Sequence, residues 1–335
     1  MLDTAVIGLG WWGRQIISTL EGSSAIRVTR AFDPQVSDQA AFPGIVLAQS
    51  FDEVLADPAI GGVILATPHS MHDAQVAAVA DAGKHVFCEK PLSLTAAGAR
   101  KSVAACEAKG LVLGIGHERR YEPGLERIAR MVADGSFGTV VTMEANFSHD
   151  RFKAVDPANW RLKSTDAPAG NMTALGIHLT DMFISLAGPV ESVFARTASR
   201  VFQAPLEDSL SVLMTFESGL TATMTCLSTV PFYGRFTVMG EHAWAELREY
   251  SNVDVDEPAT LMTSYVDGRR EEETLDPAPT VRMNLENWAD AAAGGADYRF
   301  TQRQLISNVE TLEAITLSAR RGEPVRIADL GGSGV

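Results

Sequence analysis

The stretch Thr4-Ala-Val-Ile-Gly-Leu-Gly-Trp-Trp-Gly13 reads as a short apolar strand, a glycine-rich turn and the start of a helix. Gly8, Gly10 and Gly13 stand at GxGxxG spacing, which permits a tight turn, a close backbone approach to a pyrophosphate and close packing of helix on strand. The phosphates of such a ligand lie at the N-terminus of the helix. The stretch therefore predicts a phosphate-binding turn at the start of an α/β domain.

A second expected strand, 26–32, ends at Asp33, which lies 20 residues after Gly13. A carboxylate at this spacing can accept hydrogen bonds from the adenosine ribose hydroxyls. Pro34 and Gln35 follow it, so no adjacent arginine is available for a 2′-phosphate, and the pattern favours NAD over NADP. The alternative interpretation is a glycine-rich turn of an ordinary α/β domain in which Asp33 caps a loop.

Composition excludes several classes of protein. The chain has 335 residues, of which 46% are hydrophobic and 21% charged, which suits a soluble protein of two domains. A net charge of −14 without a basic run argues against nucleic acid or an anionic membrane as partner. Cys88, Cys106 and Cys226 are odd in number and lack CxxC spacing, which favours reduced thiols and a cytoplasmic location over disulfides or a zinc cluster. No apolar run approaches the ~18 residues of a membrane span, and no metal site is expected.

Strands and helices alternate up to about residue 120, which predicts a parallel sheet covered by helices on both faces. Polar residues follow the expected strands 62–66, 85–88 and 111–116, and parallel strands bring such loops to one carboxyl edge. The residues of interest in these loops are Thr67, Pro68, His69, His72, Glu89, Lys90, His117, Arg119 and Arg120. We expect them to line one crevice. His69 and His72 form an HxxH pair with no third ligand in view, so we interpret them as loop residues on the nicotinamide side rather than metal ligands.

A second domain is expected from residue 121. It should contain helices over 123–133 and around 177–186, a strand over 139–147, and a polar loop over 148–170. Short alternating segments follow, joined by tight turns such as Asp267-Gly268, which predicts antiparallel hairpins. Thr221, Thr223 and Thr225 fall on one face of a strand, opposite a face that packs inward. A long helix over 302–319 comes last.

Lys90 is the strongest single candidate for chemistry. A lysine at the carboxyl end of a strand, stiffened by Pro91, can be desolvated and can polarise a substrate oxygen. From its position alone it is equally well a surface lysine, and Glu89 beside it is the context that favours a functional role.

Several motifs together resemble the Gfo/Idh/MocA oxidoreductase family. They are GLGWWG at 8–13, TPHSMH at 67–72, AGKHVFCEKP at 82–91, Arg120 with Pro123, Trp160-Arg161, and GIHLTD at 176–181. The resemblance implies an NAD(P)-binding Rossmann domain over 1–120 and, over 121–335, an α+β C-terminal domain with an open, mostly antiparallel sheet. That sheet would mediate a homodimer or homotetramer, and the C-terminal helix could pack back on the first domain.

The resemblance also implies roles for individual residues. The catalytic lysine of the family falls on Lys90, and its histidine, on a helix lining the substrate pocket, falls on His178, where Gly176 would permit close approach of a ligand. Many members carry an aspartate four residues before the histidine, where this chain has Ala174, so His178 acts alone or with Asp181 as its orienter, or the activity differs. The expected cofactor-binding residues are Gly8, Gly10, Trp11, Trp12, Gly13, Asp33, Thr67, Pro68, His72, Glu89 and Lys90. The expected substrate-binding residues are Lys90, His117, Arg120, Arg161, His178 and Asp181.

Two points stay open. Trp11 and Trp12 either shield the cofactor or pack on the interdomain face. Most of the basic residues before His178 are expected to be solvated, with one or two meeting a substrate carboxylate. The expected function is hydride transfer between NAD and a secondary alcohol or ketone of a sugar, polyol or related cyclic compound. The alternatives are an NAD-binding regulator without turnover and an NAD-dependent glycosidase.

Overall fold

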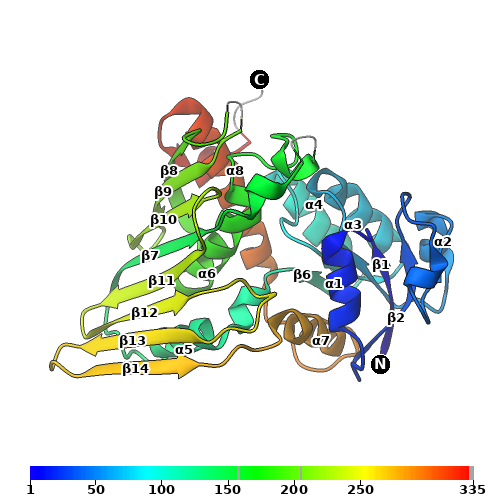
Figure 1. Cartoon of the computed structure of the whole chain (residues 1–335), viewed down its shortest axis with the longest axis horizontal. Coiled ribbons are helices and arrows are strands. Elements are labelled where there is room, and N and C mark those ends of the chain that lie inside the picture. Colours follow the sequence, from blue (N-terminus) through cyan, green and yellow to red (C-terminus); the bar gives the residue numbers. More distant parts are fainter. Residues whose placement is uncertain (157–158, 204–205, 332–335) are drawn as a thin grey trace. The chain divides into compact units, whose positions relative to one another are not determined.

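The chain divides into two compact units in the computed structural model, which describes residues 1–156, 159–203 and 206–331 (Figure 1). The first unit contains Met1–Glu118 and Val281–Ile306, and the second contains Arg119–Thr280 and Ser307–Val335. Val281–Ile306 therefore belongs to the first unit, although it lies within the segment predicted for the second domain. The structure confirms the predicted fold class, which is a Rossmann domain followed by a domain built on a mostly antiparallel sheet.

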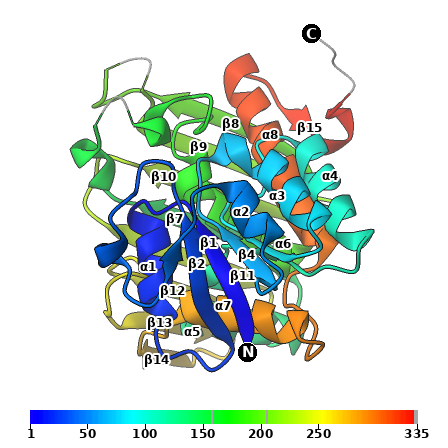
Figure 2. The same ribbon diagram turned by 90° about the vertical axis from the view of Figure 1, so that its right-hand side faces the viewer.

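The first unit is built on a six-stranded parallel sheet in the order β3-β2-β1-β4-β5-β6 (Figure 2). The order reverses between β1 and β4, and such a switch point opens a crevice at the carboxyl ends of the strands. Strand β4 is buried along its whole length, as expected where both faces of a sheet are covered. The strands are β1 (Leu2–Ile7), β2 (Ile26–Phe32), β3 (Val46–Leu47), β4 (Gly62–Leu65), β5 (His85–Cys88) and β6 (Leu113–Ile115). The helices are α1 (Trp11–Thr19), α2 (Phe51–Ala56), α3 (His72–Asp81), α4 (Ala96–Glu107) and α7 (Thr280–Ala292).

Trp288 explains why α7 joins the first unit. Its ring is fully buried and meets the Phe87 ring edge-on, with 5.6 Å between centroids. A Cβ on Gly62 would lie 2.7 Å from this indole, and one on Gly114 would lie 2.8 Å from it. The glycines of β4 and β6 thus make room for one large side chain of α7. Asn284 of the same helix donates to the carbonyl oxygen of Ile115 at 2.8 Å.

The second unit is built on a nine-stranded sheet in the order β14-β13-β12-β11-β7-β10-β9-β8-β15. Its paired strands run antiparallel except for β7 and β10, which are parallel. The strands are β7 (Val140–Ser148), β8 (Val190–Ala198), β9 (Ser209–Phe216), β10 (Thr221–Leu227), β11 (Tyr233–Gly240), β12 (Ala243–Glu249), β13 (Ala259–Tyr265), β14 (Arg270–Leu275) and β15 (Val325–Arg326). The helices are α5 (Pro123–Ala133), α6 (Ile177–Ala187) and α8 (Gln302–Arg321), and the boundary between the units falls within α8.

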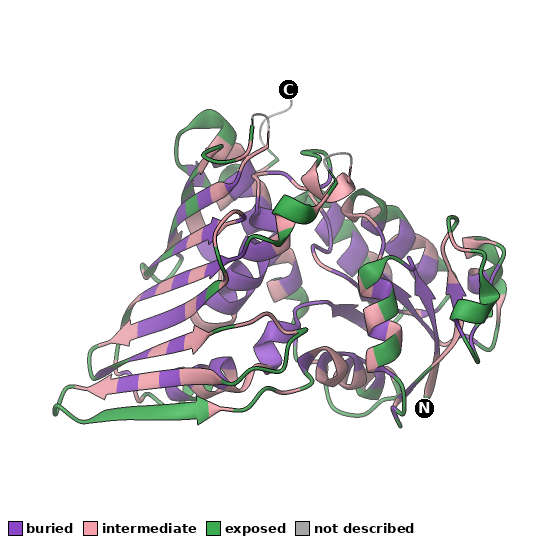
Figure 3. Ribbon diagram, in the orientation of Figure 1, coloured by how far each residue is buried: buried purple, intermediate pink, exposed green. Residues whose placement is uncertain are grey.

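The two faces of this sheet differ in burial, as the alternating sequence predicted. Ala222, Met224 and Cys226 are buried, whereas Thr221 and Thr223 on the opposite face are exposed. Figure 3 shows the same alternation of buried and less buried residues along neighbouring strands. Helices α5, α6 and α8 lie on the buried face, so the core of this unit is a layer between helices and sheet.

Three predicted segments differ from the structure. Strands and helices were expected to alternate up to about residue 120, but the segment between β2 and β3 contains only a 3₁₀ turn, Gln39–Ala41. Asp38 caps this turn, and Pro43 disfavours helical backbone at Phe42. The loop over 148–170 contains the 3₁₀ turns Arg151–Ala154 and Trp160–Leu162. Helix α6 is preceded by a π-helical turn, Met172–Gly176. Among the helices of the described residues, none combines the length and the apolarity that a membrane crossing requires.

Candidate active site

In the glycine-rich turn after β1, a side chain at Gly8 or Gly13 would clash with the backbone, whereas the space beside Gly10 is open. Gly8 has φ +92°, and a Cβ there would lie 2.5 Å from the carbonyl oxygen of Ala66 in the loop after β4. A Cβ on Gly13 would lie 1.9 Å from the carbonyl oxygen of Gly8, whereas one on Gly10 would meet nothing within 4 Å. Gly10 is the N-cap of α1 and makes no side-chain cap. The open backbone at this helix start fits the pyrophosphate of a dinucleotide.

Asp33 lies against this turn. One carboxylate oxygen accepts from the amide of Leu9 at 2.8 Å, and the other accepts from the amide of Gln35 at 2.9 Å. Each oxygen has a second lone pair, so the half-buried carboxylate can still accept from ribose hydroxyls. The structure therefore brings together the glycines and the acid that the sequence predicted as one group.

Trp11 and Trp12 follow Gly10 at the start of α1. Their ring centroids lie 5.3 Å apart, but Trp11 is 57% exposed and Trp12 is half-buried. An exposed indole beside the open turn suits the shielding role, whereas Trp12 packs into the unit. Shielding of the cofactor by these tryptophans therefore stays a prediction.

His72 connects two loops of the first unit. It is fully buried, with Nδ1 2.7 Å from the carbonyl oxygen of Pro91 and Nε2 3.1 Å from that of Thr67. Both ring nitrogens thus face protein carbonyls rather than an open surface. We therefore interpret His72 as a residue that supports the loops after β4 and β5, with Thr67 and Pro68 as the residues of the β4 loop nearer a ligand.

Glu89 and Lys90 follow β5 at the same carboxyl edge. Glu89 is buried, and a Cβ on Gly116 would lie within 2.6 Å of its carboxylate, so only glycine fits behind it. Burial raises the pKa of Glu89 above its ordinary value, an effect that the neighbouring Trp12 indole and Lys90 oppose. Lys90 is half-buried, and its peptide bond to Pro91 is cis. His117, after β6, is buried with its ring centroid 6.3 Å from that of Phe300.

His178 lies in the first turn of α6 in the second unit. It is buried and meets the ring of Phe147 edge-on, with 6.4 Å between centroids. The same phenyl ring has the Arg119 guanidinium 4.2 Å from its centre, and the rings of His149 and Phe232 at 5.9 and 6.0 Å. Phe147 therefore links His178 to a cluster of aromatic and cationic side chains, which the sequence did not predict.

The expectation that Gly176 permits close approach of a ligand is wrong. A Cβ on Gly176 would lie 2.7 Å from the sulfur of Met172 and 3.1 Å from the methyl carbon of Met224, so protein side chains already occupy that space. Gly176 also ends the π turn, in which its amide donates to the carbonyl of Asn171 five residues back. Ala174 lies within this turn, so the simple helical spacing assumed for the position four residues before His178 does not hold.

Arg120 and Asp181 form a buried ion pair. Arg120 Nε and Nη2 donate to the two carboxylate oxygens at 2.7 and 2.6 Å, and both side chains are nearly inaccessible. Asp181 is thus engaged by Arg120 through both oxygens. This arrangement corrects its expected role as the orienter of His178. It also gives Arg120, which was expected among the substrate-binding residues, a carboxylate partner within the protein.

Three other basic residues before α6 are also engaged. Arg119 donates to both oxygens of Glu249, at 2.8 and 2.9 Å, and burial raises the pKa of Glu249 while Arg119 opposes that rise. The Arg161 guanidinium lies 4.4 Å from the centre of the Trp160 ring, and burial lowers its pKa. Arg151 pairs with Asp254 at 2.9 Å, on the more exposed side of the unit.

Two family profiles match the chain. The profile described as an NAD-binding Rossmann-fold oxidoreductase family matches residues 2–117, and the one described as the GFO/IDH/MocA C-terminal domain matches residues 125–246. The chain belongs to the Gfo/Idh/MocA family. It is accordingly an NAD(P)-dependent oxidoreductase, and its first unit is the NAD-binding domain.

Members of the Gfo/Idh/MocA family that resemble this chain include sugar-converting enzymes. D-xylose 1-dehydrogenase (NADP(+)) 2 of Haloferax volcanii is 29% identical over 98% of each chain. The 1,5-anhydro-D-fructose reductase of Ensifer adhaerens is 27% identical over 83% of each chain. A crystal structure of aldose-aldose oxidoreductase from Caulobacter crescentus has a TM-score of 0.86 and 24% identity, covering 97% of this chain and 99% of that one, which shows the shared fold.

The residues predicted from the family motifs fall into two groups, one in each unit. The glycines, Asp33, the loop after β4, Lys90 and His117 belong to the first unit, and His178, Arg120, Arg161 and Asp181 to the second. Sequence reasoning missed Phe147, His149 and Asn308, whose amide donates to the carbonyl of Ile177 at 3.2 Å. The available signal for Asn308 was a polar residue on the apolar face of a long helix.

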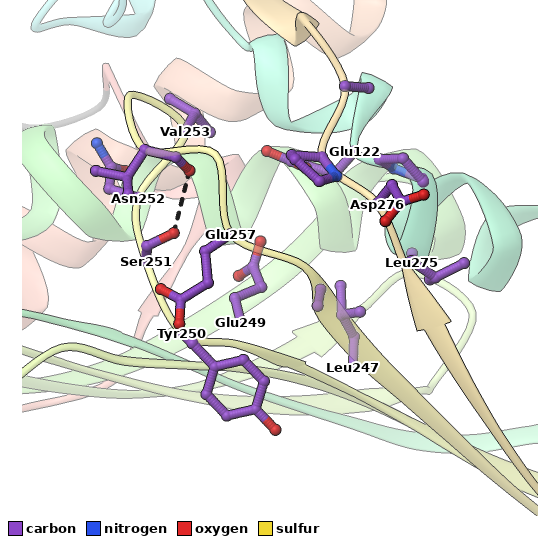
Figure 4. Close-up of a pocket in the computed structure, with 16 residues that line it drawn as sticks. Glu122, Leu247, Glu249, Tyr250, Ser251, Asn252, Val253, Glu257, Leu275 and Asp276 are labelled. Carbon is purple, nitrogen blue, oxygen red and sulfur yellow. Dashed lines mark hydrogen bonds between the residues drawn. The ribbon is translucent and has the colours of Figure 1, made fainter.

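A pocket in the second unit lies apart from these residues. It is lined by Glu122, Glu249, Glu257 and Asp276 among others, and no residue predicted for the site lines it (Figure 4). Carboxylates alone do not define a ligand, and we assign it no role. In the part of the chain that the structure describes, no group of three or more acidic, histidine or cysteine residues could hold a metal ion.

Proposed function

We propose that this chain transfers a hydride between NAD and a secondary alcohol or ketone of a sugar, polyol or related cyclic compound. The observation that carries the proposal is the placement of the glycine turn, Asp33 and Lys90 at the carboxyl ends of neighbouring parallel strands around a switch point. The sugar-converting relatives support the substrate class. Bound NAD supplies the hydride acceptor or donor.

Lys90 and His178 have separate tasks in this proposal. The Lys90 ammonium polarises the substrate oxygen and stabilises negative charge that develops on it, an effect that is large in a site shielded from water. The imidazole of His178 takes or gives the hydroxyl proton, as histidine can in either direction near neutral pH. The ion pair of Arg120 and Asp181 holds the helix that carries His178.

Lys90→Met tests this assignment. We expect NADH binding, followed by its fluorescence, to stay within a few-fold of the original, while turnover on a panel of sugars and polyols falls by a factor of about 10² to 10³ or more. Lys101→Met, which removes an exposed lysine from α4, is the matched control. Equal turnover in the Lys90→Met and Lys101→Met variants would remove Lys90 from the mechanism. If the original protein binds NADH but turns over no substrate, the result would instead support the alternative of an NAD-binding regulator without turnover.

NAD is proposed as the preferred cofactor because Asp33 favours free ribose hydroxyls and repels a 2′-phosphate. The relatives include an NADP(+) enzyme, so this preference is specific to the residues of this chain. The three cysteines are buried and free, which supports a reducing compartment such as the cytoplasm.

The chain is also proposed to form a homodimer or homotetramer through the sheet of the second unit. The face of the sheet opposite the helices carries Phe194, Leu213, Tyr233 and Trp244, which are between 36% and 47% exposed. The register places Phe194 beside Leu213 on adjacent strands. Large apolar side chains gathered on one face are typical of a surface that another protein covers.

A further inference from the structure

Arg14, in the first turn of α1, is an exposed cation that bonds to the same residue, Leu9, as Asp33, the carboxylate expected to bind the ribose. Its Nε donates to the carbonyl oxygen of Leu9 at 2.9 Å, and the amide of the same residue donates to Asp33 at 2.8 Å. Leu9 thus holds Arg14 on its carbonyl side and Asp33 on its amide side. The two charged groups lie on either side of a single residue of the glycine-rich turn.

The guanidinium is held in place but not neutralised. Its central carbon lies 4.7 Å from the centre of the Phe42 ring, and Phe42 is buried in the core of the first unit. A guanidinium stacked on a fixed ring loses little freedom when it binds a ligand. Across residues 1–156, 159–203 and 206–331, no carboxylate forms an ion pair with Arg14. Within the described residues, the four N–H groups on its two terminal nitrogens donate to no protein acceptor.

We infer that Arg14 forms a subsite for the 2′-phosphate of NADP(H), which gives this chain a second usable cofactor beside NAD. A guanidinium can bind a phosphate through two parallel hydrogen bonds, and an arginine near the ribose acid is what accommodates a 2′-phosphate in Rossmann domains. Asp33 repels the same phosphate, so Arg14 offsets the preference for NAD without reversing it. The inference rests on the proposed function only in requiring the dinucleotide site.

This subsite could not be predicted from the sequence, because Pro34 and Gln35, the residues next to Asp33, are not basic. The arginine that the structure places nearby comes from the helix that precedes β2.

Calorimetric titration of the full chain with 2′,5′-ADP and with 5′-AMP tests the subsite, because the two ligands differ only in the 2′-phosphate. We expect Arg14→Met to weaken the binding of 2′,5′-ADP about tenfold relative to that of 5′-AMP, the scale of one lost charge-assisted contact. Arg14→Lys should weaken it less, since lysine keeps the charge and loses the fork. Arg27→Met is the matched control: it removes an exposed cation, paired with Asp3, from the other end of β2 and should leave the ratio of affinities unchanged.

The outcomes separate this inference from the proposed function. An affinity ratio that is equal in the original protein and in Arg14→Met overturns the subsite while leaving the dinucleotide site intact. Failure of the original protein to bind either nucleotide overturns both. Asp33→Asn provides a second background: it should strengthen the binding of 2′,5′-ADP relative to that of 5′-AMP, and adding Arg14→Met to it should remove that gain. A gain that survives the double substitution also overturns the subsite.

Discussion

At Glu89, burial and the neighbouring polar groups have opposite effects on the pKa of the carboxyl group. Glu89 lies between Gly116 and the cofactor-side loops with almost no exposure, and burial raises the pKa of its carboxyl. Below the pKa of an unfolded glutamate, about 4.3, the group is protonated in both the folded and unfolded states and costs nothing. As the pH rises from there through the raised folded pKa, ionisation increasingly disfavours folding, and above that value the cost is constant.

Glu89→Gln should therefore stabilise the protein at pH 8 and lose that advantage near pH 4. Each unit of pKa shift is worth about 1.4 kcal/mol, so the gain in the free energy of unfolding should be measurable by urea denaturation at both pH values. Glu107→Gln, an exposed carboxylate on α4, is the control and should change stability little at either pH. A Glu89→Gln variant that is less stable at pH 8 than at pH 4, each relative to the original, would show that the charge is stabilised by its neighbours instead.

The buried ion pair between Arg120 and Asp181 of α6 leads to a prediction about the free energy of unfolding. Removing one partner of a buried pair leaves an uncompensated charge, which typically costs about 3 to 5 kcal/mol. We expect Arg120→Met to lose this much unfolding free energy, and Arg120→Met with Asp181→Leu to lose much less than the sum of the two single variants. Arg326 and Glu191 form an exposed pair in the same unit, so Arg326→Met should cost less than about 1 kcal/mol. Equal costs for Arg120→Met and Arg326→Met would contradict the buried pair.

At the scale of elements, what the sequence predicted depended on local spacing. GxGxxG fixes a turn within six residues, and the strand that ends at Asp33 lies next in the chain, so both could be predicted together with the parallel sheet. The place of α7 could not, because the buried Trp288 gives no indication in the sequence that its partners are Gly62 and Gly114. The π turn before His178 also escaped prediction, since its register depends on packing around Gly176.

The sequence also failed to predict which groups the charged side chains contact. Most of the basic residues before His178 were expected to be solvated, yet Arg119 and Arg120 each pair with a carboxylate far away in the sequence, and Arg161 meets the neighbouring Trp160 ring. Periodicity shows which side of an element is apolar, but it does not show which carboxylate an arginine reaches across a fold. Pairing of this kind follows from tertiary contacts alone.

At the scale of the whole molecule, the net charge of −14 repels a second copy at long range, while the open sheet face favours contact. The centre of that face contains Glu144, Arg235, Glu246 and Arg248, two charges of each sign, linked by ion pairs of 2.8 to 3.8 Å. The contact region is thus locally neutral and is flanked by the exposed apolar residues. Salt screens the long-range repulsion over a Debye length of about 10 Å at 0.1 M and leaves apolar contact in place.

We therefore expect association at micromolar concentration that becomes stronger, not weaker, between low and moderate salt. Light scattering should give a mass of at least two chains, and Leu213→Lys, at the exposed apolar edge of the face, should shift the mass toward one chain without lowering the melting temperature by more than a few degrees. Val266→Lys is the control, because Val266 is 79% exposed at the turn between β13 and β14. If Val266→Lys dissociates the assembly and Leu213→Lys does not, the contact lies at the end of the sheet rather than on its face. A mass of one chain at every salt concentration would exclude association through either surface.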